Sequence, residues 1–221
     1  MPRNVSIEIF RYDPQKDDSP SWRTYTIPYE EKNTVLGALI YIQENIDPSF
    51  AFRYGCRYKR CGLCALEVDG KPRMACHTYL QEGMRIGPLS KLPVIRDLAV
   101  DRKSIFHDLK KYSLYIEKKE ENVEIIVEPE QGARLRSCAE CLSCLSTCSR
   151  YNFGNGNFGG PFLFVKLAQL QFDPRNSKNR FEQAHALGIM HCRDCKNKCF
   201  CPNGINIYGD AICSLLENNV D

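Results

Sequence analysis

The sequence predicts an α+β fold in two domains, with strands concentrated in residues 1–100 and helices in residues 101–221. Apolar and polar residues alternate in the early segments, as in half-buried strands, and later recur every three to four residues, as in helices. The 13 cysteines fall into three groups, and residues 77–137 contain none. This distribution of the cysteines also favours two domains.

The predicted first domain contains two strands, a helix and a hairpin. Three segments have strand character: Val5–Tyr12, Trp22–Pro28 and Ala65–Val68. The last of these precedes Asp69-Gly70, which is typical of a hairpin turn. Thr34–Ile46 has a helical period, and Asn33 or Thr34 is expected to cap it. This order of elements predicts a small β-grasp domain.

The predicted second domain is helical. Three segments have helical spacing: Asp101–Tyr115, Phe162–Leu170 and Ile205–Leu216. Between the first two, Lys118–Glu130 is acidic and polar, and is expected to be a solvated connection.

Composition places the chain among ordinary globular proteins. It has 43% hydrophobic residues and a formal net charge of only +3, so binding to nucleic acid is not expected. It contains neither a secretory signal nor a transmembrane run, which predicts a cytoplasmic protein with no transmembrane segment of its own. In a reducing compartment, so many thiols indicate metal or redox chemistry rather than disulfides.

The first cysteine group is Cys56-x4-Cys61-x2-Cys64, with Cys76 after it. Three ligands on a tight loop and a fourth nearby are typical of a plant-type 2Fe–2S cluster. A zinc site is the alternative, but zinc prefers two well-separated pairs of cysteines. Four basic residues accompany the loop and would stabilise a reduced, more negative cluster: Arg53, Arg57, Lys59 and Arg60.

The second and third cysteine groups have ferredoxin character. The second group spaces its members as in bacterial ferredoxins: Cys138, Cys141, Cys144 and Cys148. The third group ends in Cys-Pro but has altered spacing: Cys192, Cys195, Cys199 and Cys201. In two-cluster ferredoxins the last cysteine of each run binds the other cluster.

This crossover predicts two ligand sets. One 4Fe–4S cluster is expected on Cys138, Cys141, Cys144 and Cys201. A third cluster, either 4Fe–4S or 3Fe–4S, is expected on Cys148, Cys192, Cys195 and Cys199. The remaining cysteine, Cys213, is expected to be a small buried residue on the last helix.

These motifs resemble the iron–sulfur subunit of the succinate dehydrogenase/fumarate reductase family. Four segments carry the resemblance: Phe52–Ala65, Leu89–Val100, Cys138–Cys148 and Cys201–Gly204. The four motifs stand in the order of the family, and the resemblance extends over nearly the whole chain. The resemblance implies a plant-type ferredoxin domain at residues 1–100 and a bacterial-ferredoxin-like helical domain at residues 101–221.

The resemblance also implies a place in an oxidoreductase complex. In this family, electrons pass through the clusters between an FAD-containing flavoprotein subunit and a membrane quinone. A membrane-anchor subunit with quinone or haem is then a further partner, and the chain would sit peripherally on the cytoplasmic face of the inner membrane. No catalytic residue and no cofactor other than the clusters is expected in this chain, which would not be catalytic alone.

Two departures from the family pattern bear on function. The family has a 3Fe–4S third cluster because one ferredoxin position is not cysteine, whereas Cys195 occupies that position here and favours 4Fe–4S. The tryptophan pair and the histidine of the family's quinone pocket are replaced by Ser149-Arg150-Tyr151 and Arg193. An alternative is therefore a soluble relay subunit of a thiol-linked fumarate reductase or heterodisulfide reductase type complex. A zinc or scaffold module without redox function is a third possibility.

Overall fold

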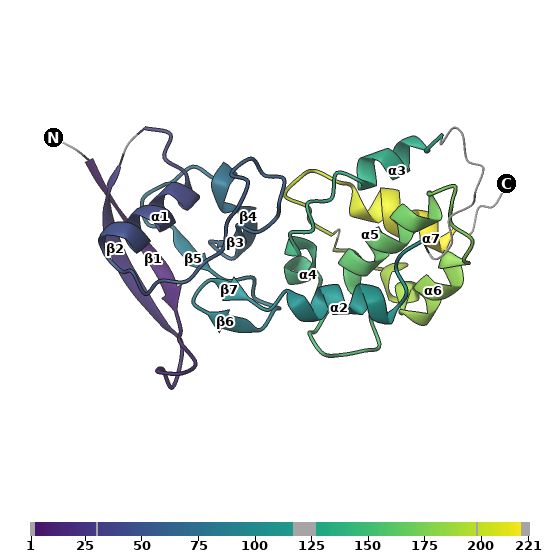
Figure 1. Ribbon diagram of the computed structural model, residues 1–221, viewed down its shortest axis with the longest axis horizontal. Helices are drawn as coiled ribbons and strands as arrows, with labels where there is room; N and C mark the ends of the chain where they lie inside the picture. The colour runs from purple at the N-terminus through teal and green to yellow at the C-terminus, as the bar shows by residue number, and fades with distance from the viewer. Residues whose placement is uncertain (1–2, 30, 117–126, 198, 218–221) are drawn as a thin grey trace. The chain divides into compact units, whose positions relative to one another are not determined.

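The computed structural model describes residues 3–29, 31–116, 127–197 and 199–217. Contacts divide the chain into two compact units. The first unit joins residues 1–101 with residues 139–146, and the second joins residues 102–138 with residues 147–221. Figure 1 traces the chain from the strands of the first unit to the helices of the second.

The first unit is built on a five-stranded mixed sheet of order β2-β1-β5-β3-β4. Its strands are β1 (Arg3–Arg11), β2 (Ser21–Tyr29), β3 (Ala65–Val68), β4 (Lys71–Met74) and β5 (Arg85–Gly87). β1 pairs antiparallel with β2 and parallel with β5, which makes it an inner strand. A second sheet pairs β6 (Val94–Arg96) with β7 (Ala99–Val100).

The core of this unit lies between the sheet and helix α1 (Val35–Asn45), which packs against β2. Alternate residues of β1 and β2 are buried, and Ile7 lies opposite Tyr25 in the register. Thr34 caps α1, because its Oγ1 accepts a hydrogen bond of 3.2 Å from the Gly37 N–H. The predicted strands β1, β2 and β3, the hairpin after β3, the helix and the cap Thr34 are confirmed, whereas β5, β6 and β7 were not predicted.

The second unit consists of short helices around the buried helix α5 (Gly160–Gln171). The others are α2 (Lys103–Lys111), α3 (Glu130–Leu135), α6 (Arg180–Ala186), the 3-10 turn η2 (Ile189–Cys192), the π-helix η3 (Ile207–Cys213) and α7 (Ser214–Leu216). Helix α4 (Ser143–Thr147) lies largely within the segment that belongs to the first unit. Aromatic and aliphatic side chains of α5 form the centre of the core.

The helical unit differs from the sequence prediction in three places. The helix expected over Asp101–Tyr115 is shorter and covers Lys103–Lys111. The helix expected over Ile205–Leu216 is mostly a π-helix, preceded by Asn206, whose side chain accepts a hydrogen bond from the Gly209 N–H. Helices α3 and α6 were not predicted. Of the connection predicted over Lys118–Glu130, residues 118–126 lie outside the described residues.

Candidate metal centres

The first cysteine group is held together by the β3–β4 hairpin. Cys64 directly precedes β3, and Cys76 lies in the 3-10 turn η1 (Ala75–His77), directly after β4. The Ala75 N–H donates a hydrogen bond of 3.0 Å to the Cys64 carbonyl, which fixes the two cysteines side by side. Cys56 and Cys61 come from the loop that leads into this hairpin.

Backbone N–H groups of the loop converge on the sulfur of Cys56. Tyr58, Arg60 and Cys61 each donate to Cys56 Sγ at 3.3 Å. Arg57 and Lys59 both have φ of +59°, a region that non-glycine residues rarely adopt, and this conformation turns the N–H groups inward. The strained backbone of the loop therefore directs three N–H donors at the sulfur, where they stabilise a thiolate.

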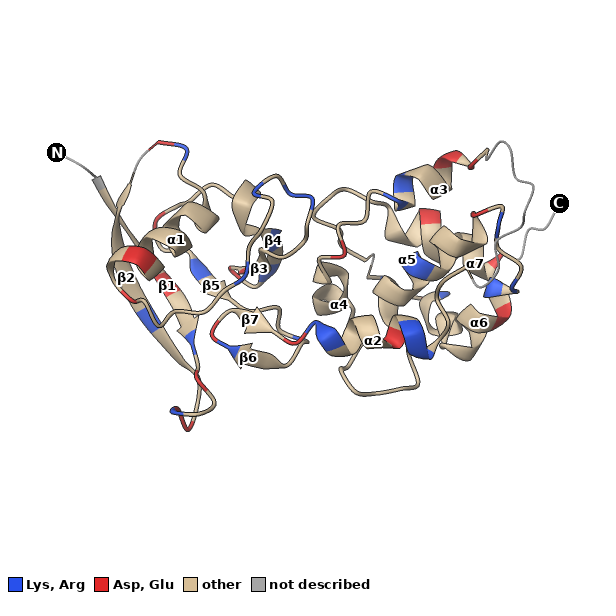
Figure 2. Cartoon of the chain, viewed as in Figure 1, with Lys and Arg blue, Asp and Glu red and all other residues tan. Residues whose placement is uncertain are grey.

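The thiols of this group differ in their acidity. The N–H groups of Tyr58 and Arg60 lower the pKa of the Cys56 thiol to about 7. Burial is the main cause that raises the pKa of Cys64 to about 12. A buried thiol loses its proton when its sulfur binds a metal ion, because the metal takes the place of the proton. An electron-rich sulfur cluster suits this donor set, because its negative charge is offset by the N–H donors and by the basic residues of the loop, where Figure 2 colours the backbone blue.

The second cysteine group is divided between the two units. Cys141 and Cys144 belong to the first unit, and both are buried. The thiol of Cys141 donates to Ser143 Oγ at 3.4 Å. Cys138 and Cys201 belong to the second unit. The ligand set predicted from these four residues draws on both units and stays a prediction.

The third predicted set lies entirely within the second unit. All four of its thiols line one small cavity: Cys148, Cys192, Cys195 and Cys199. Burial and, to a lesser extent, the neighbouring cysteines raise the pKa of both Cys192 and Cys199 to about 12. Cys195 Sγ also donates to the Asn197 carbonyl at 3.3 Å. The structure thus brings the four cysteines together, and which of them bind iron stays a prediction.

The π-helix η3 brings a residue to this cavity that sequence patterns missed. Tyr208 lines the cavity, and its hydroxyl donates to the Arg193 carbonyl at 3.3 Å. Burial raises the pKa of Tyr208, and Cys213 and Cys192 contribute. Cys213 itself is only half-buried, in contrast to the fully buried position expected for it. The position of this tyrosine, six residues after Cys201-Pro202, could have drawn attention to it in the sequence. Only the fold shows which groups its hydroxyl contacts.

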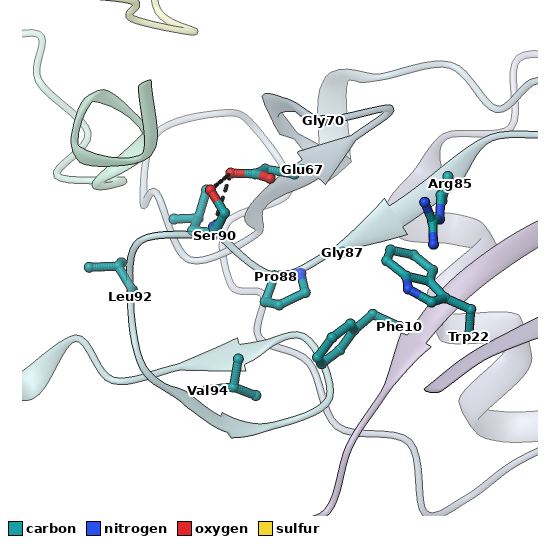
Figure 3. A pocket seen from close by; sticks show the side chains of 11 residues that line it. Phe10, Trp22, Glu67, Gly70, Arg85, Gly87, Pro88, Ser90, Leu92 and Val94 are labelled. Carbon is teal, nitrogen blue, oxygen red and sulfur yellow. Dashed lines mark hydrogen bonds between the residues drawn. The ribbon is translucent and has the colours of Figure 1, made fainter. Parts of the chain in front are cut away.

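Another cavity, of about 410 Å³, lies in the first unit (Figure 3). Phe10 and Trp22 meet edge to face there, with ring centroids 5.6 Å apart. The Arg85 guanidinium carbon lies 3.8 Å from the centroid of the Trp22 ring, and Glu67 accepts hydrogen bonds from Ser90. Among the described residues that line this cavity there is no cysteine, so it is separate from the metal centres.

Within the described ranges, no three His, Cys, Asp or Glu side chains are arranged to hold a single metal ion. A 2Fe–2S or 4Fe–4S cluster has a different requirement, because its four thiolates are shared among two or four irons. The same described ranges contain no helix that is long and apolar enough to cross a membrane.

Comparison with known proteins defines the class of protein to which this chain belongs. Residues 6–107 match the family model of a 2Fe–2S iron–sulfur cluster binding domain. Over the whole chain, the structure of the Mycobacterium smegmatis Sdh1 complex in the apo form contains a similar chain, with a TM-score of 0.85 and 26% identity. The similarity covers 98% of this chain and 95% of that one. The fold and the cysteine-rich loop are thus those of an iron–sulfur protein.

Two curated relatives specify the family. The fumarate reductase iron–sulfur subunit of Escherichia coli O6:H1 is 30% identical over 202 residues, which cover 86% of this chain and 82% of that protein. The chain therefore belongs to the iron–sulfur subunits of the succinate dehydrogenase/fumarate reductase family, as its motifs predicted. One subunit of the fumarate reductase (CoM/CoB) of Methanothermobacter marburgensis is 34% identical over 213 residues, 94% of this chain. This chain spans only 43% of that relative's length.

Proposed function

We propose that this chain relays single electrons between an FAD-containing flavoprotein subunit and a membrane quinone. The observation that carries the proposal is the cradle of three N–H groups around Cys56 Sγ in a 2Fe–2S binding domain. Such a cradle stabilises added negative charge at a sulfur, which is what a reversible electron acceptor requires. When bound, iron–sulfur clusters supply one-electron transfer at potentials set by their surroundings.

Three ligand sets follow for this relay. The first, for a 2Fe–2S cluster, is Cys56, Cys61, Cys64 and Cys76. The second, for a 4Fe–4S cluster, is Cys138, Cys141, Cys144 and Cys201. The third, for a 4Fe–4S cluster with 3Fe–4S as the alternative, is Cys148, Cys192, Cys195 and Cys199. A plant-type ferredoxin domain over residues 1–100 would hold the first set, and a bacterial-ferredoxin-like helical domain over residues 101–221 would hold the others.

The protein surrounds these thiols in two ways that suit a relay. Backbone N–H groups and basic side chains offset negative charge at the first set. Burial of Cys64 and Cys192 keeps water from their sulfurs, which lowers the reorganisation that accompanies electron transfer. No residue of the chain is assigned a role in binding or converting a dicarboxylate, so succinate or fumarate chemistry would reside on the flavoprotein subunit.

A membrane-anchor subunit with quinone or haem would be the other partner, at the cytoplasmic face of the inner membrane. A specific observation also favours a second candidate, a relay for a thiol-linked fumarate reductase. The CoM/CoB relative matches almost the whole chain, and Arg150, Tyr151 and Arg193 replace the residues with which this family contacts quinone. In that candidate the electron donor would be a pair of thiols rather than a quinol.

The experiment uses the complex purified anaerobically with whatever subunits accompany the chain. Electron paramagnetic resonance (EPR) would count the clusters, and reduction by a quinol or by coenzyme M and coenzyme B thiols would be followed in the same sample. Reduction of the clusters by quinol, followed by fumarate-dependent reoxidation, supports the first candidate. Reduction by the thiols alone supports the second. A preparation that contains zinc and no iron–sulfur signal would contradict both.

A further inference from the structure

Gly62 brings the first cysteine loop into contact with the second cysteine run. It follows Cys61 directly, and its φ is +68°. A Cβ atom at this position would lie 2.2 Å from the Ala139 carbonyl oxygen and 2.8 Å from the backbone N and Cα of Cys141. All of these residues belong to the first compact unit. The two backbones therefore meet at a distance that only a glycine allows.

The left-handed backbone alone does not explain this contact. Gly70 and Gly83 have nearly the same φ, +71° and +73°, and a Cβ at either position would have no heavy atom within 4 Å. At those two positions only the backbone conformation of the turn favours glycine. At Gly62, both the backbone conformation and the close approach of another backbone segment require glycine.

The facing segment is itself strained. Glu140 and Leu142, on either side of Cys141, have φ values of +54° and +65°, although neither is glycine. Conformations of this kind cost free energy of order 1–3 kcal/mol each and persist where the surrounding structure holds them. Leu142 is fully buried, which provides such support. Both sides of the contact are thus shaped to bring Cys61 and Cys141 near each other.

We propose that Gly62 is a positioning residue that sets the separation, and hence the electron transfer, between the first and second clusters. The inference rests on the proposed function, because it assumes a cluster on each cysteine group. No bond forms or breaks across the contact; a single electron lost on one side is gained on the other. A side chain at residue 62 would have to push the Ala139–Cys141 backbone away, since a carbonyl oxygen and a Cα cannot be displaced by a rotamer change.

The test compares Gly62→Ala with Gly70→Ala in the complete, anaerobically purified protein. Both variants place a Cβ on a left-handed backbone, but only Gly62→Ala meets the second cysteine run. With both clusters reduced, their magnetic dipolar coupling, measured by EPR, reports their separation. The expected result is weaker coupling and slower electron transfer between the two clusters in Gly62→Ala, with both signals at normal intensity. Gly70→Ala should retain the coupling of the unmodified protein.

Normal coupling in Gly62→Ala, with both clusters present, would overturn the inference and leave the proposed function standing. Absence of iron–sulfur signals from the unmodified protein would instead overturn the proposed function. If Gly62→Ala assembles no cluster, Gly62→Asn serves in its place, because asparagine tolerates this backbone conformation better. If that variant also assembles no cluster, the coupling is measured in the unmodified protein alone. Absence of coupling between its first and second clusters would contradict the inference that the contact at Gly62 holds them near each other.

Discussion

The carboxylate of Asp97 accepts a hydrogen bond of 2.9 Å from Nε of Arg11. It also accepts backbone hydrogen bonds from Tyr12, at the end of β1, and from Ala51, at 3.0 and 2.8 Å. Ala51 stands five residues before Cys56, so one buried carboxylate links the end of the inner strand β1 to the base of the first cysteine loop. This explains in physical terms why an aspartate stands in the Leu89–Val100 segment that resembles the family.

Replacing Asp97 with alanine should destabilise the first unit by on the order of 3 kcal/mol, because buried N–H donors and the Arg11 guanidinium lose their acceptor. Asp97→Asn should cost less, since it retains an acceptor oxygen and tolerates the φ of +46° at this position. Chemical denaturation monitored by the fluorescence of Trp22 measures both. Equal losses in the two variants would mean that the charge, rather than the hydrogen bonds, is responsible.

Cys61→Ser should remove or alter the EPR signal of the first cluster only, because serine offers a harder oxygen ligand to iron that prefers thiolate. Cys213→Ser is the matched control, since Cys213 lies outside all three predicted ligand sets. It should leave every cluster signal intact. Full retention of the first signal in Cys61→Ser would show that the ligand set is misassigned.

Cys195 decides the iron content of the third cluster. If it is a ligand, the oxidised protein should contain a 4Fe–4S cluster there, and Cys195→Ser should convert this cluster to 3Fe–4S with the gain of its characteristic EPR signal. A stoichiometric 3Fe–4S signal in the unmodified, anaerobic protein would mean instead that the hydrogen bond from Cys195 Sγ to the Asn197 carbonyl persists in the assembled protein.

Tyr208→Phe should lower the midpoint potential of the third cluster alone. The hydroxyl donates to the Arg193 carbonyl beside that cavity, and its loss leaves the negative end of this carbonyl dipole uncompensated, which disfavours the more negative reduced state. Potentiometric titration followed by EPR measures the shift. Tyr115→Phe, at an exposed position of the same unit, is the control and should leave all potentials unchanged. An equal shift in both variants would contradict a specific role for Tyr208.

Stability should fall in acid partly through Asp173. This nearly buried carboxylate accepts hydrogen bonds from Arg175 Nε and Nη2 at 2.9 and 2.7 Å, which hold its pKa well below the ordinary value near 3.9. Because the pKa is lower in the folded than in the unfolded state, the pair contributes fully above about pH 4. Its contribution is lost as the pH falls from there through the folded pKa.

Asp173→Asn should therefore destabilise the second unit at neutral pH and flatten the loss of stability below about pH 4. Urea unfolding followed by circular dichroism of the helices, at a series of pH values, measures this. Asp18→Asn, at an exposed position, is the control. An acid limb as steep in Asp173→Asn as in the unmodified protein would contradict the assignment.

Local patterns were sufficient to predict β1, β2, the β3–β4 hairpin and α1, but not the three short strands β5, β6 and β7. Strand alternation, a helical period and a capping threonine each depend on residues close in sequence, and so does the spacing of the cysteines. Helices α3 and α6 were missed because six and seven residues are too few to display a helical period. The π-helix was missed because shifting each hydrogen bond by one residue barely changes the hydrophobic pattern.

The contacts around the candidate centres were less accessible from the sequence. The approach of Gly62 to Ala139 joins segments 77 residues apart, and Tyr208 reaches Arg193 across another loop. Hydrophobic spacing and cysteine motifs describe neither relationship, because both depend on how distant segments pack. The sequence motifs therefore indicated which residues gather, and the fold was needed to identify the residues that position them.

The route of the chain through its two units has a consequence for biosynthesis. Residues 139–146 complete the first unit, so when residue 101 emerges from the ribosome the sheet still lacks the backbone against which Gly62 packs. At about 5–20 residues per second, several seconds separate the two events. During that interval the thiols of Cys56 and Cys61 are presented by an incomplete scaffold. A fragment ending at residue 101 would remain in this incomplete state permanently, and we expect iron and sulfide to be inserted only after residue 146 has emerged.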